Sequence, residues 1–429
     1  MTKEQRTRQG VFWAVTIGYG LFYVCRLSIS VLKKGIIDDG FLTESELGII
    51  GSALFFGYAV GKLFNGFLAD HINVRYFMSA GLLICAIINA VLALKVPFIV
   101  FVILWAINGW FQSVGAPCSI ISLKRWFGND GFGTKYGYWS LSHNLGEAIT
   151  FYVTALIVGA LGWQAGFLGA AGMGLLGVVL IFGLLRPFQA AEEQPAASTK
   201  ERIKETGSKQ LAVLKMPIIW VLALASAFMY MARYAFTSWG IFYFQTEKGY
   251  SVESASFLLM LSSACGIVGT VGSGLVSDKV FGGDRTLMAF LTSLINLLAL
   301  TAFLFVPAGF YWADCIIVVL FGLSIGVLIC FLGGLMAVDI APAEAAGATA
   351  GVIGMASYAA AGLQDIVSGY LIEGRKVMID VMEDGVMKQV AQYDFSAIRL
   401  FWIAAGTISL ALLIYIYIHA RRHPQPKME

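Results

Sequence analysis

Two arginines lie deep inside long apolar stretches of this sequence. Arg26 follows Tyr23-Val-Cys, and Arg233 follows Tyr230-Met-Ala, at a separation of 207 residues. A charged side chain at membrane depth is costly and usually faces a cavity or a partner. Two guanidinium groups at equivalent depths repel each other unless an anion lies between them, and the forked donors of arginine suit a tetrahedral phosphate. We therefore predict an anion site between Arg26 and Arg233.

Other charged residues in apolar stretches admit two interpretations. Glu147, Asp339 and Asp365 could each neutralise one of the two arginines, and the arginines would then be structural. Lys62 could be a third cation beside a dianion, or it could extend toward the cytoplasmic interface. On the first interpretation, the apolar interior holds an excess of positive charge.

A histidine and several tyrosines lie near these cations in the sequence. His143 is one helical turn from Glu147, and it could titrate alongside phosphate or simply pack. Tyr23 and Tyr230 each lie three residues before an arginine, so each shares a helix face with it. Tyr19 and Tyr58 are expected on similar faces. Their hydroxyl groups and ring faces suit a sugar or glycerol ester, although aromatic packing explains any single tyrosine equally well.

The composition indicates that these residues lie within a membrane. Hydrophobic residues make up 58% of the 429 positions, and only 13% are charged, against about 25% in soluble domains. We predict an all-α polytopic membrane protein with about twelve transmembrane helices. The expected helices cover about 10–33, 46–70, 75–95, 97–124, 134–160, 163–186, 216–245, 253–278, 286–306, 311–339, 345–372 and 396–419.

The loops carry an asymmetric charge. Alternate loops hold 18 Lys and Arg on one side and 7 on the other, so both termini are predicted to be cytoplasmic. The seven on the other side are Lys33, Lys34, Lys95, Lys248, Arg375, Lys376 and Lys388. The external loop at about 373–394 could form a small hairpin around Glu383-Asp384-Gly385.

The chain also repeats itself. Gly66-Phe-Leu-Ala-Asp70 followed by Arg75 recurs as Gly274-Leu-Val-Ser-Asp278 followed by Arg285, at a separation of 208 residues. Together with the arginine repeat, this predicts two six-helix halves in parallel orientation, 1–186 and 216–429, joined by a polar cytoplasmic linker at 187–215. We expect Asp70, Arg75, Asp278 and Arg285 to gate the cytoplasmic side.

Several classes of function are not indicated by the sequence. We find no phosphate-cradling nucleotide loop, no catalytic triad, and no metal-ligating or Cys-x-x-Cys cluster among the 6 cysteines. We therefore expect no enzyme activity, no cofactor, no bound metal and no nucleic-acid partner. The expected partners are the lipid bilayer and a small anion.

Longer motifs around these residues resemble the organophosphate:phosphate antiporter family of the major facilitator superfamily. The resemblance covers essentially the whole chain. It is strongest at Gly18-Tyr-Gly-Leu-Phe-Tyr-Val-Cys-Arg26, Tyr58-Ala-Val-Gly-Lys62, Gly109-Trp-Phe-Gln112, Trp139-Ser-Leu-Ser-His143-Asn144-Leu-Gly146 and Tyr230-Met-Ala-Arg233. Members of this family include glycerol-3-phosphate and hexose-6-phosphate transporters and a membrane sensor of glucose 6-phosphate.

The resemblance implies alternating access by rocking of the halves, with Arg26 and Arg233 as a phosphate clamp and Lys62 and His143 beside it. Positions matching the family's pocket are Tyr19, Tyr23, Tyr58, Trp139, Asn144, Tyr230 and Tyr358. Two departures bear on the substrate. Ala350 and Ile353 stand where some hexose-phosphate carriers have an aspartate and a lysine, and Glu147 stands where relatives tend to have glycine.

The expected function is exchange of a phosphate ester, most closely a hexose 6-phosphate such as glucose 6-phosphate, for inorganic phosphate. The alternatives are a glycerol-3-phosphate:phosphate antiporter, a non-transporting sensor of glucose 6-phosphate, and a proton-coupled symporter in which Glu147 and His143 carry the proton. The superfamily implies a monomer, and the lack of glycosylation sequons favours a bacterial inner membrane.

Overall fold

Within the residues that the structure describes, twelve helical segments are long and apolar enough to cross a membrane. The computed structural model describes residues 2–128, 131–186, 215–336, 346–383 and 386–422. In a lipid core each backbone N–H and C=O needs a partner within its own segment, and a helix supplies it. The prediction of a twelve-helix membrane protein is confirmed.

The described residues of the first half form six spans, two of them interrupted. Its helices are α1 (Lys3–Asp38), α2 (Glu44–His71), α3 (Val74–Leu92), α4 (Phe98–Gln112), α5 (Gly115–Phe127), α6 (Phe132–Ser140), α7 (Ser142–Leu161) and α8 (Trp163–Leu184). α4 with α5, and α6 with α7, each form one span. Threonines begin the first two helices: Thr2 and Thr43 each form a capping box with the residue three positions later.

The second half repeats this plan and adds a hairpin. Its elements are α10 (Pro217–Thr246), α11 (Val252–Val280), α12 (Arg285–Phe305), α13 (Tyr311–Cys330), the π-helical turn η1 (Phe331–Leu335), α15 (Ala346–Glu373), β1 (Lys376–Glu383), β2 (Val386–Tyr393) and α16 (Ser396–Arg422). Buried asparagines mark the repeat, because Asn89 in α3 and Asn296 in α12 are 207 residues apart and both donate side-chain hydrogen bonds inside their half.

Glycines allow the helices of each half to approach closely. A Cβ added at Gly109 in α4 would lie 2.1 Å from the carbonyl oxygen of Leu54 in α2. In the second half, a Cβ at Gly322 in α13 would lie 2.0 Å from the carbonyl oxygen of Ser262 in α11. Backbone contact of this kind is typical of membrane helices, where small residues line the interfaces.

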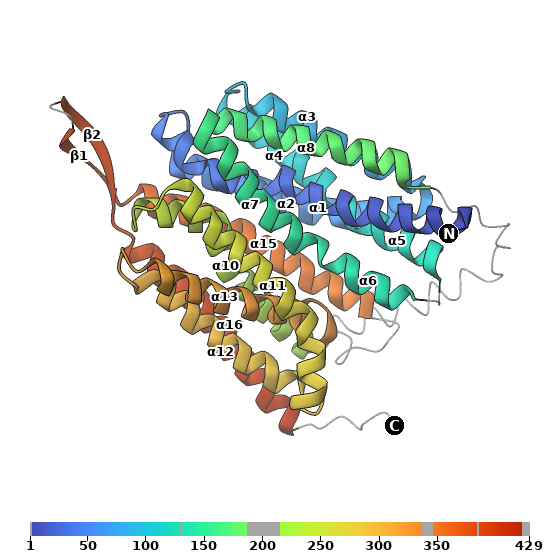
Figure 1. Ribbon diagram of the computed structural model, residues 1–429. Helices are drawn as coiled ribbons and strands as arrows, with labels where there is room; N and C mark the ends of the chain where they lie inside the picture. Colours follow the sequence, from blue (N-terminus) through green and yellow to red (C-terminus); the bar gives the residue numbers. More distant parts are fainter. Residues whose placement is uncertain (1, 129–130, 187–214, 337–345, 384–385, 423–429) are drawn as a thin grey trace.

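The loop predicted to be external forms a hairpin. β1 and β2 pair antiparallel, with Lys376 opposite Tyr393, and the hairpin projects from one end of the bundle (Figure 1). We call this end of the bundle the hairpin end, and we call the end where α1 begins and α16 finishes the terminal end.

An acidic residue is stabilised where β2 leads into α16. The N–H and hydroxyl of Ser396 and the guanidinium of Arg375 lower the pKa of Asp394 to about 2.

The two halves meet at the hairpin end. Lys376 and the hydroxyl of Tyr393 donate hydrogen bonds to the carboxylate of Glu44 in α2, at 3.0 Å and 2.5 Å. The N–H of Ser45 donates to Glu373 of α15 at 2.8 Å. A Cβ at Gly48 in α2 would lie 2.5 Å from the backbone of Asp365 in α15. Helices of opposite halves are therefore in backbone contact here.

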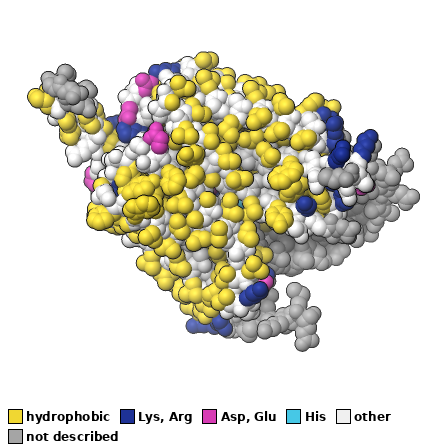
Figure 2. All heavy atoms as spheres, viewed as in Figure 1, with side chains coloured by type: hydrophobic (Ala, Val, Ile, Leu, Met, Phe, Trp, Pro, Cys, Tyr) yellow, Lys and Arg dark blue, Asp and Glu magenta, His cyan; other side chains and the backbone are white. Residues whose placement is uncertain are grey.

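The halves separate toward the terminal end. A Cβ added there at Gly66, Gly272, Gly274 or Gly351 would meet no described atom within 4 Å. The two bundles diverge in the same direction (Figure 1). Figure 2 shows apolar side chains covering the visible face of the bundle, as a lipid-exposed surface requires, with Lys and Arg gathered near the start of α1. Among the described residues, the two halves are thus in contact at the hairpin end and apart at the terminal end.

Alanine substitutions at Gly109 and Gly172 are expected to change thermal stability in opposite directions. At Gly109 the added Cβ meets backbone of α2, which cannot move aside alone, so the melting temperature falls by several degrees. At Gly172 no atom lies within 4 Å, and alanine is favoured over glycine in a helix by up to ~1 kcal/mol. Thermal unfolding of the purified protein in detergent measures both. Equal melting temperatures would contradict the close packing of α2 on α4.

Candidate functional site

Arg26 lies within a box of aromatic rings. Its side chain is buried, with 3% of its surface exposed, and it donates a hydrogen bond of 2.8 Å to the hydroxyl of Tyr234. Its guanidinium carbon is 5.0–5.8 Å from the ring centroids of Tyr23, Phe55, Tyr58, Tyr234 and Tyr358. Ring faces stabilise a cation at such distances, so the box offsets part of the cost of burying the charge of Arg26. No carboxylate forms an ion pair with it in the described part of the chain.

Buried amides fix the helix turn that carries Arg26. The side chains of Asn89 in α3 and Asn108 in α4 both donate to the carbonyl oxygen of Cys25, at 3.0 Å and 3.1 Å. Both asparagines are fully buried. A buried polar side chain is retained where its hydrogen bonds are satisfied, and here those bonds hold the backbone next to Arg26 against the rest of the first half.

Arg233 of α10 faces the same region from the second half, but it is paired. It donates to the carboxylate of Glu147 in α7 at 2.6 Å, and both side chains are at most 5% exposed. The hydroxyl of Ser263 in α11 donates to the other carboxylate oxygen at 3.4 Å. Arg233 is therefore paired with Glu147, one of the three carboxylates that the sequence offered as partners. Asp365 pairs with Lys33 instead, and Asp339 lies outside the described residues.

Tyr234 brings the two arginines into one site. Its ring centroid is 5.8 Å from the guanidinium carbon of Arg26 and 5.3 Å from that of Arg233. Tyr230 lies 5.8 Å from Arg233 in the same way. Neither Tyr234 nor Phe55 was predicted from the sequence. Tyr234 directly follows Arg233 in the sequence. Adjacent residues lie on different faces of a helix, so the spacing that indicates Tyr230 does not indicate Tyr234.

Lys62 reaches the same aromatic group from α2. Its ammonium nitrogen is 5.6 Å from the ring centroid of Tyr358, whose ring also packs on Tyr58 at 4.5 Å. Lys62 and Tyr58 line a cavity of about 350 Å³ between α2 and α5. The lysine is exposed in this structure, and a Cβ added at Gly354 in α15 would lie 3.0 Å from it. It therefore stands between the halves on the terminal side of Arg26.

The break between α6 and α7 presents the remaining predicted residues. The Trp139 ring packs on Tyr19 at 5.0 Å, and the His143 ring lies 6.0 Å from Tyr23. Three buried donor atoms on α1, α6 and α7 have no hydrogen-bond partner among the described residues: Arg26 Nε, Trp139 Nε1 and Asn144 Nδ2. Buried donors are rarely left unsatisfied. An acceptor-rich ligand that reached these three donors would satisfy them.

A second buried ion pair joins the halves at the hairpin end. Lys33 of α1 donates to Ser238 at 2.8 Å and lies 3.8 Å from the carboxylate of Asp365 in α15. Ser238 and Trp239 of α10 donate to the same carboxylate oxygen at 2.7 Å and 2.8 Å. The assignment of Lys33 to an external loop is wrong, because α1 continues to Asp38 and the lysine is 1% exposed.

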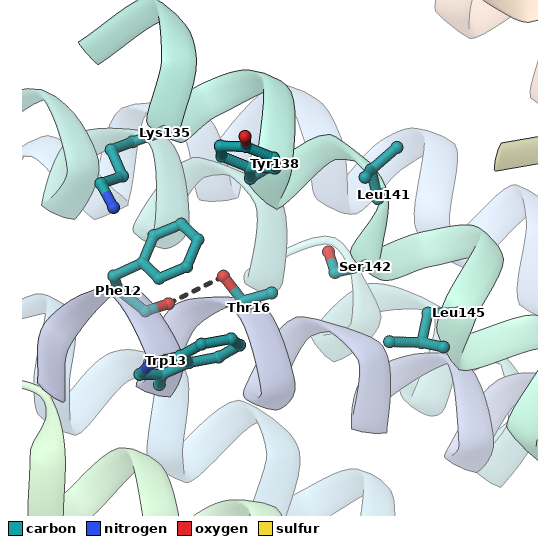
Figure 3. A pocket seen from close by; sticks show the side chains of 8 residues that line it. All are labelled: Phe12, Trp13, Thr16, Lys135, Tyr138, Leu141, Ser142 and Leu145. Atoms are coloured by element: carbon teal, nitrogen blue, oxygen red, sulfur yellow. Dashed lines mark hydrogen bonds between the residues drawn. The ribbon is translucent and has the colours of Figure 1, made fainter. Parts of the chain in front are cut away.

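A separate groove lies beside α1, away from the arginines. Its volume is about 390 Å³, and its lining is almost entirely apolar. Figure 3 shows Trp13 and Phe12 of α1 facing Tyr138 and Leu145, with Lys135 at one end. The ammonium group of Lys135 is 4.5 Å from the Phe12 ring centroid. None of the residues predicted for the anion site lines this groove.

Comparison with known proteins places the chain in a family. The Major Facilitator Superfamily model matches residues 15–364. The probable hexose phosphate transport protein of Chlamydia pneumoniae is 31% identical over 379 residues, which is 83% of each chain. The glycerol-3-phosphate transporter of Bacillus subtilis is 30% identical over 392 residues, covering 86% of this chain and 87% of the other. The chain belongs to the organophosphate:phosphate antiporter family of this superfamily.

Other relatives extend this picture. The membrane sensor protein UhpC of Salmonella typhimurium is 29% identical over 374 residues, or 83% of each chain. Among solved structures, a point mutant of the nucleoside transporter NupG superposes with a TM-score of 0.75 at 12% identity, covering 96% of this chain and 99% of the other. An inward-facing, unoccupied bacterial homologue of the lysosomal transporter Spinster gives 0.73 at 17%, covering 98% and 96%. These two share the major facilitator fold.

The residues expected to gate this antiporter-family protein stay a prediction. Arg75 of α3 donates to the carbonyl oxygen of Phe182 in α8 at 2.7 Å and stacks on that ring. This contact lies within the first half. Asp278 is exposed near the end of α11, and Arg285 begins α12. The side chain of Asp70 lies outside the described set.

The Lys33–Asp365 pair gives a stability test. Asp365→Asn preserves the shape of the side chain but leaves Lys33 buried without its anion, so the free energy of unfolding should fall by up to about 3 kcal/mol. Adding Lys33→Met removes the unpaired charge, and the double variant should regain most of the loss. Thermal unfolding of the two variants in detergent measures this. A double variant no more stable than Asp365→Asn would contradict the importance of the pair.

Proposed function

We propose that the chain is a secondary active transporter that exchanges a phosphate ester for inorganic phosphate by alternating access. One observation carries the proposal: Arg26 and Arg233 come from opposite halves and flank Tyr234 at the centre of the molecule. A phosphate group between them would accept forked hydrogen bonds from both. The unpartnered donors of Arg26, Trp139 and Asn144 support the same ligand.

The names of the relatives support the substrate class. Those with 30% identity or more are named as hexose phosphate and glycerol-3-phosphate transporters. We favour a hexose 6-phosphate such as glucose 6-phosphate, because the aromatic box offers ring faces and hydroxyls to a sugar. Glycerol 3-phosphate is the alternative, since Ala350 and Ile353 lack the charges found at the matching positions of some hexose-phosphate carriers.

We place the protein in a bacterial inner membrane as a monomer. We place both termini in the cytoplasm, because the Lys and Arg of the loops gather on the terminal side. In that orientation the open end faces the cytoplasm, and the state described here is inward-facing. Rocking of the halves around the arginines would break the Glu44 and Lys33 contacts at the hairpin end and open the site outward.

Exchange follows from the charge of the site. Arg26, Arg233 and Lys62 contribute three cations, and Glu147 one carboxylate, to a site that becomes enclosed midway through the rocking motion. Enclosing the remaining positive charge without a further anion is unfavourable in a low-dielectric interior, and a bound dianion removes that cost. Phosphate moving outward along its gradient would therefore return the carrier to its outward-facing state, in which it can take up the ester.

The proposal is tested by exchange in proteoliposomes. Vesicles are preloaded with unlabelled phosphate, radiolabelled phosphate is added outside, and glucose 6-phosphate or glycerol 3-phosphate is supplied as a competitor. We expect rapid exchange that one ester inhibits more strongly than the other. Ester binding without exchange would instead identify the protein as a sensor, the class to which the Salmonella relative is assigned. Uptake that follows the proton gradient without internal phosphate would indicate a proton symporter.

Lysine substitutions of the two arginines should abolish exchange. Arg26→Lys and Arg233→Lys each keep the charge but lose the fork that holds two phosphate oxygens, so the exchange rate should fall by ~100-fold or more. Arg422→Lys, an exposed position at the end of α16, is the matched control and should exchange normally. Wild-type exchange by either inner arginine variant would contradict the proposed clamp.

A further inference from the structure

Glu147 occupies a place in the site that the clamp mechanism does not explain. Its carboxylate is buried and accepts hydrogen bonds from Arg233 and Ser263, which both belong to the opposite half. Arg26 has no such partner in the described part of the chain and is bound by a neutral tyrosine hydroxyl. The two arginines of the proposed clamp are therefore unequal. Arg26 is free to receive an anion, and Arg233 already holds one.

We propose that Glu147 is a tethered anion that replaces phosphate at Arg233 in the empty transporter and permits the empty transporter to reorient. This inference rests on the proposed function and modifies its coupling. A carboxylate and a phosphate group present similar oxygens to a guanidinium. The nitrogen of Arg233 that donates to Glu147 at 2.6 Å is then unavailable to phosphate until the carboxylate moves away.

The charges of the site support the exchange of one anion for the other. Arg26, Arg233 and Lys62 with Glu147 make three cations and one carboxylate, so two positive charges remain. A phosphate ester in its dianionic form balances them. Without the carboxylate, the empty site would hold three uncompensated cations, and the cost of enclosing them would be highest.

The contact geometry supports reorientation without substrate. Glu147 bridges α7 of the first half to α10 and α11 of the second, at the level where the site must close in the middle of the cycle. Alongside it, Gly146 packs on Gly20 of α1, where an added Cβ would lie 2.5 Å from the carbonyl oxygen. The backbone next to Glu147 is thus held rigidly against α1, and displacement of the carboxylate takes place in the side chain.

The test compares Glu147→Gln with wild type in two measurements. The first is equilibrium binding of radiolabelled inorganic phosphate to the purified protein. The second is the ratio of net uptake, into vesicles without internal phosphate, to exchange uptake, into vesicles preloaded with it. Glu4→Gln, on the exposed first turn of α1, removes a carboxylate outside the site and is the matched control.

In Glu147→Gln we expect phosphate to bind about tenfold more tightly, because it no longer competes with a charge-assisted hydrogen bond. We expect the ratio of net uptake to exchange to fall by about tenfold, since the empty site can no longer close. Ser263→Ala removes the weaker contact to Glu147 and should shift both quantities in the same direction by less. It serves as the second variant if Glu147→Gln does not fold.

The outcomes separate the inference from the proposed function. Suppose that the wild-type protein exchanges phosphate, but that both site variants bind phosphate no more tightly and show an unchanged ratio of net uptake to exchange. That result would overturn the role of Glu147 and leave the proposed function intact. A general loss of stability would lower net uptake and exchange together and leave their ratio unchanged, which also overturns it. If wild type neither binds phosphate nor exchanges it, the proposed function fails, and this inference fails with it.

Discussion

Positive charge buried between two apolar bundles is the constraint on which this structure depends. A guanidinium or ammonium group in a membrane interior needs a compensating partner, and this chain supplies a different one at each level. Lys33 has the carboxylate of Asp365, Arg233 has that of Glu147, and Arg26 has a box of aromatic rings. Because each partner of these cations includes a residue of the opposite half, charge compensation is also what brings the halves together.

The same contacts explain why one end of the molecule is closed and the other open. At the hairpin end, ion pairs coincide with backbone packing, as where Asp365 lies against Gly48. Toward the terminal end, Lys62 is exposed, and Cβ atoms added at Gly66 of α2 and at Gly272 and Gly274 of α11 would meet no described atom within 4 Å. A transporter of this superfamily that alternates between two states must exchange these contacts for equivalent ones at the other end, and the central arginines remain at the pivot.

Much of this could be predicted from the sequence. Hydropathy and length define the spans, and repeats 207 residues apart predict that Arg26 and Arg233 meet at equivalent depths. The partners could not be predicted, because they depend on which helix faces come together between halves. Glu147 was one of several carboxylates in apolar stretches, and Tyr234 has no distinctive motif. Lys33 appeared to lie in a loop because hydropathy marks where apolar residues stop, and α1 continues past that point as a buried helix.

The central claim is that a phosphate group binds between Arg26 and Arg233, and a structure of the protein with bound phosphate tests it most directly. The account predicts density for the anion beside Tyr234, within hydrogen-bonding distance of both guanidinium groups, with the carboxylate of Glu147 turned away from Arg233. Phosphate bound elsewhere, with the Arg233–Glu147 pair intact at its present separation of 2.6 Å, would contradict the account.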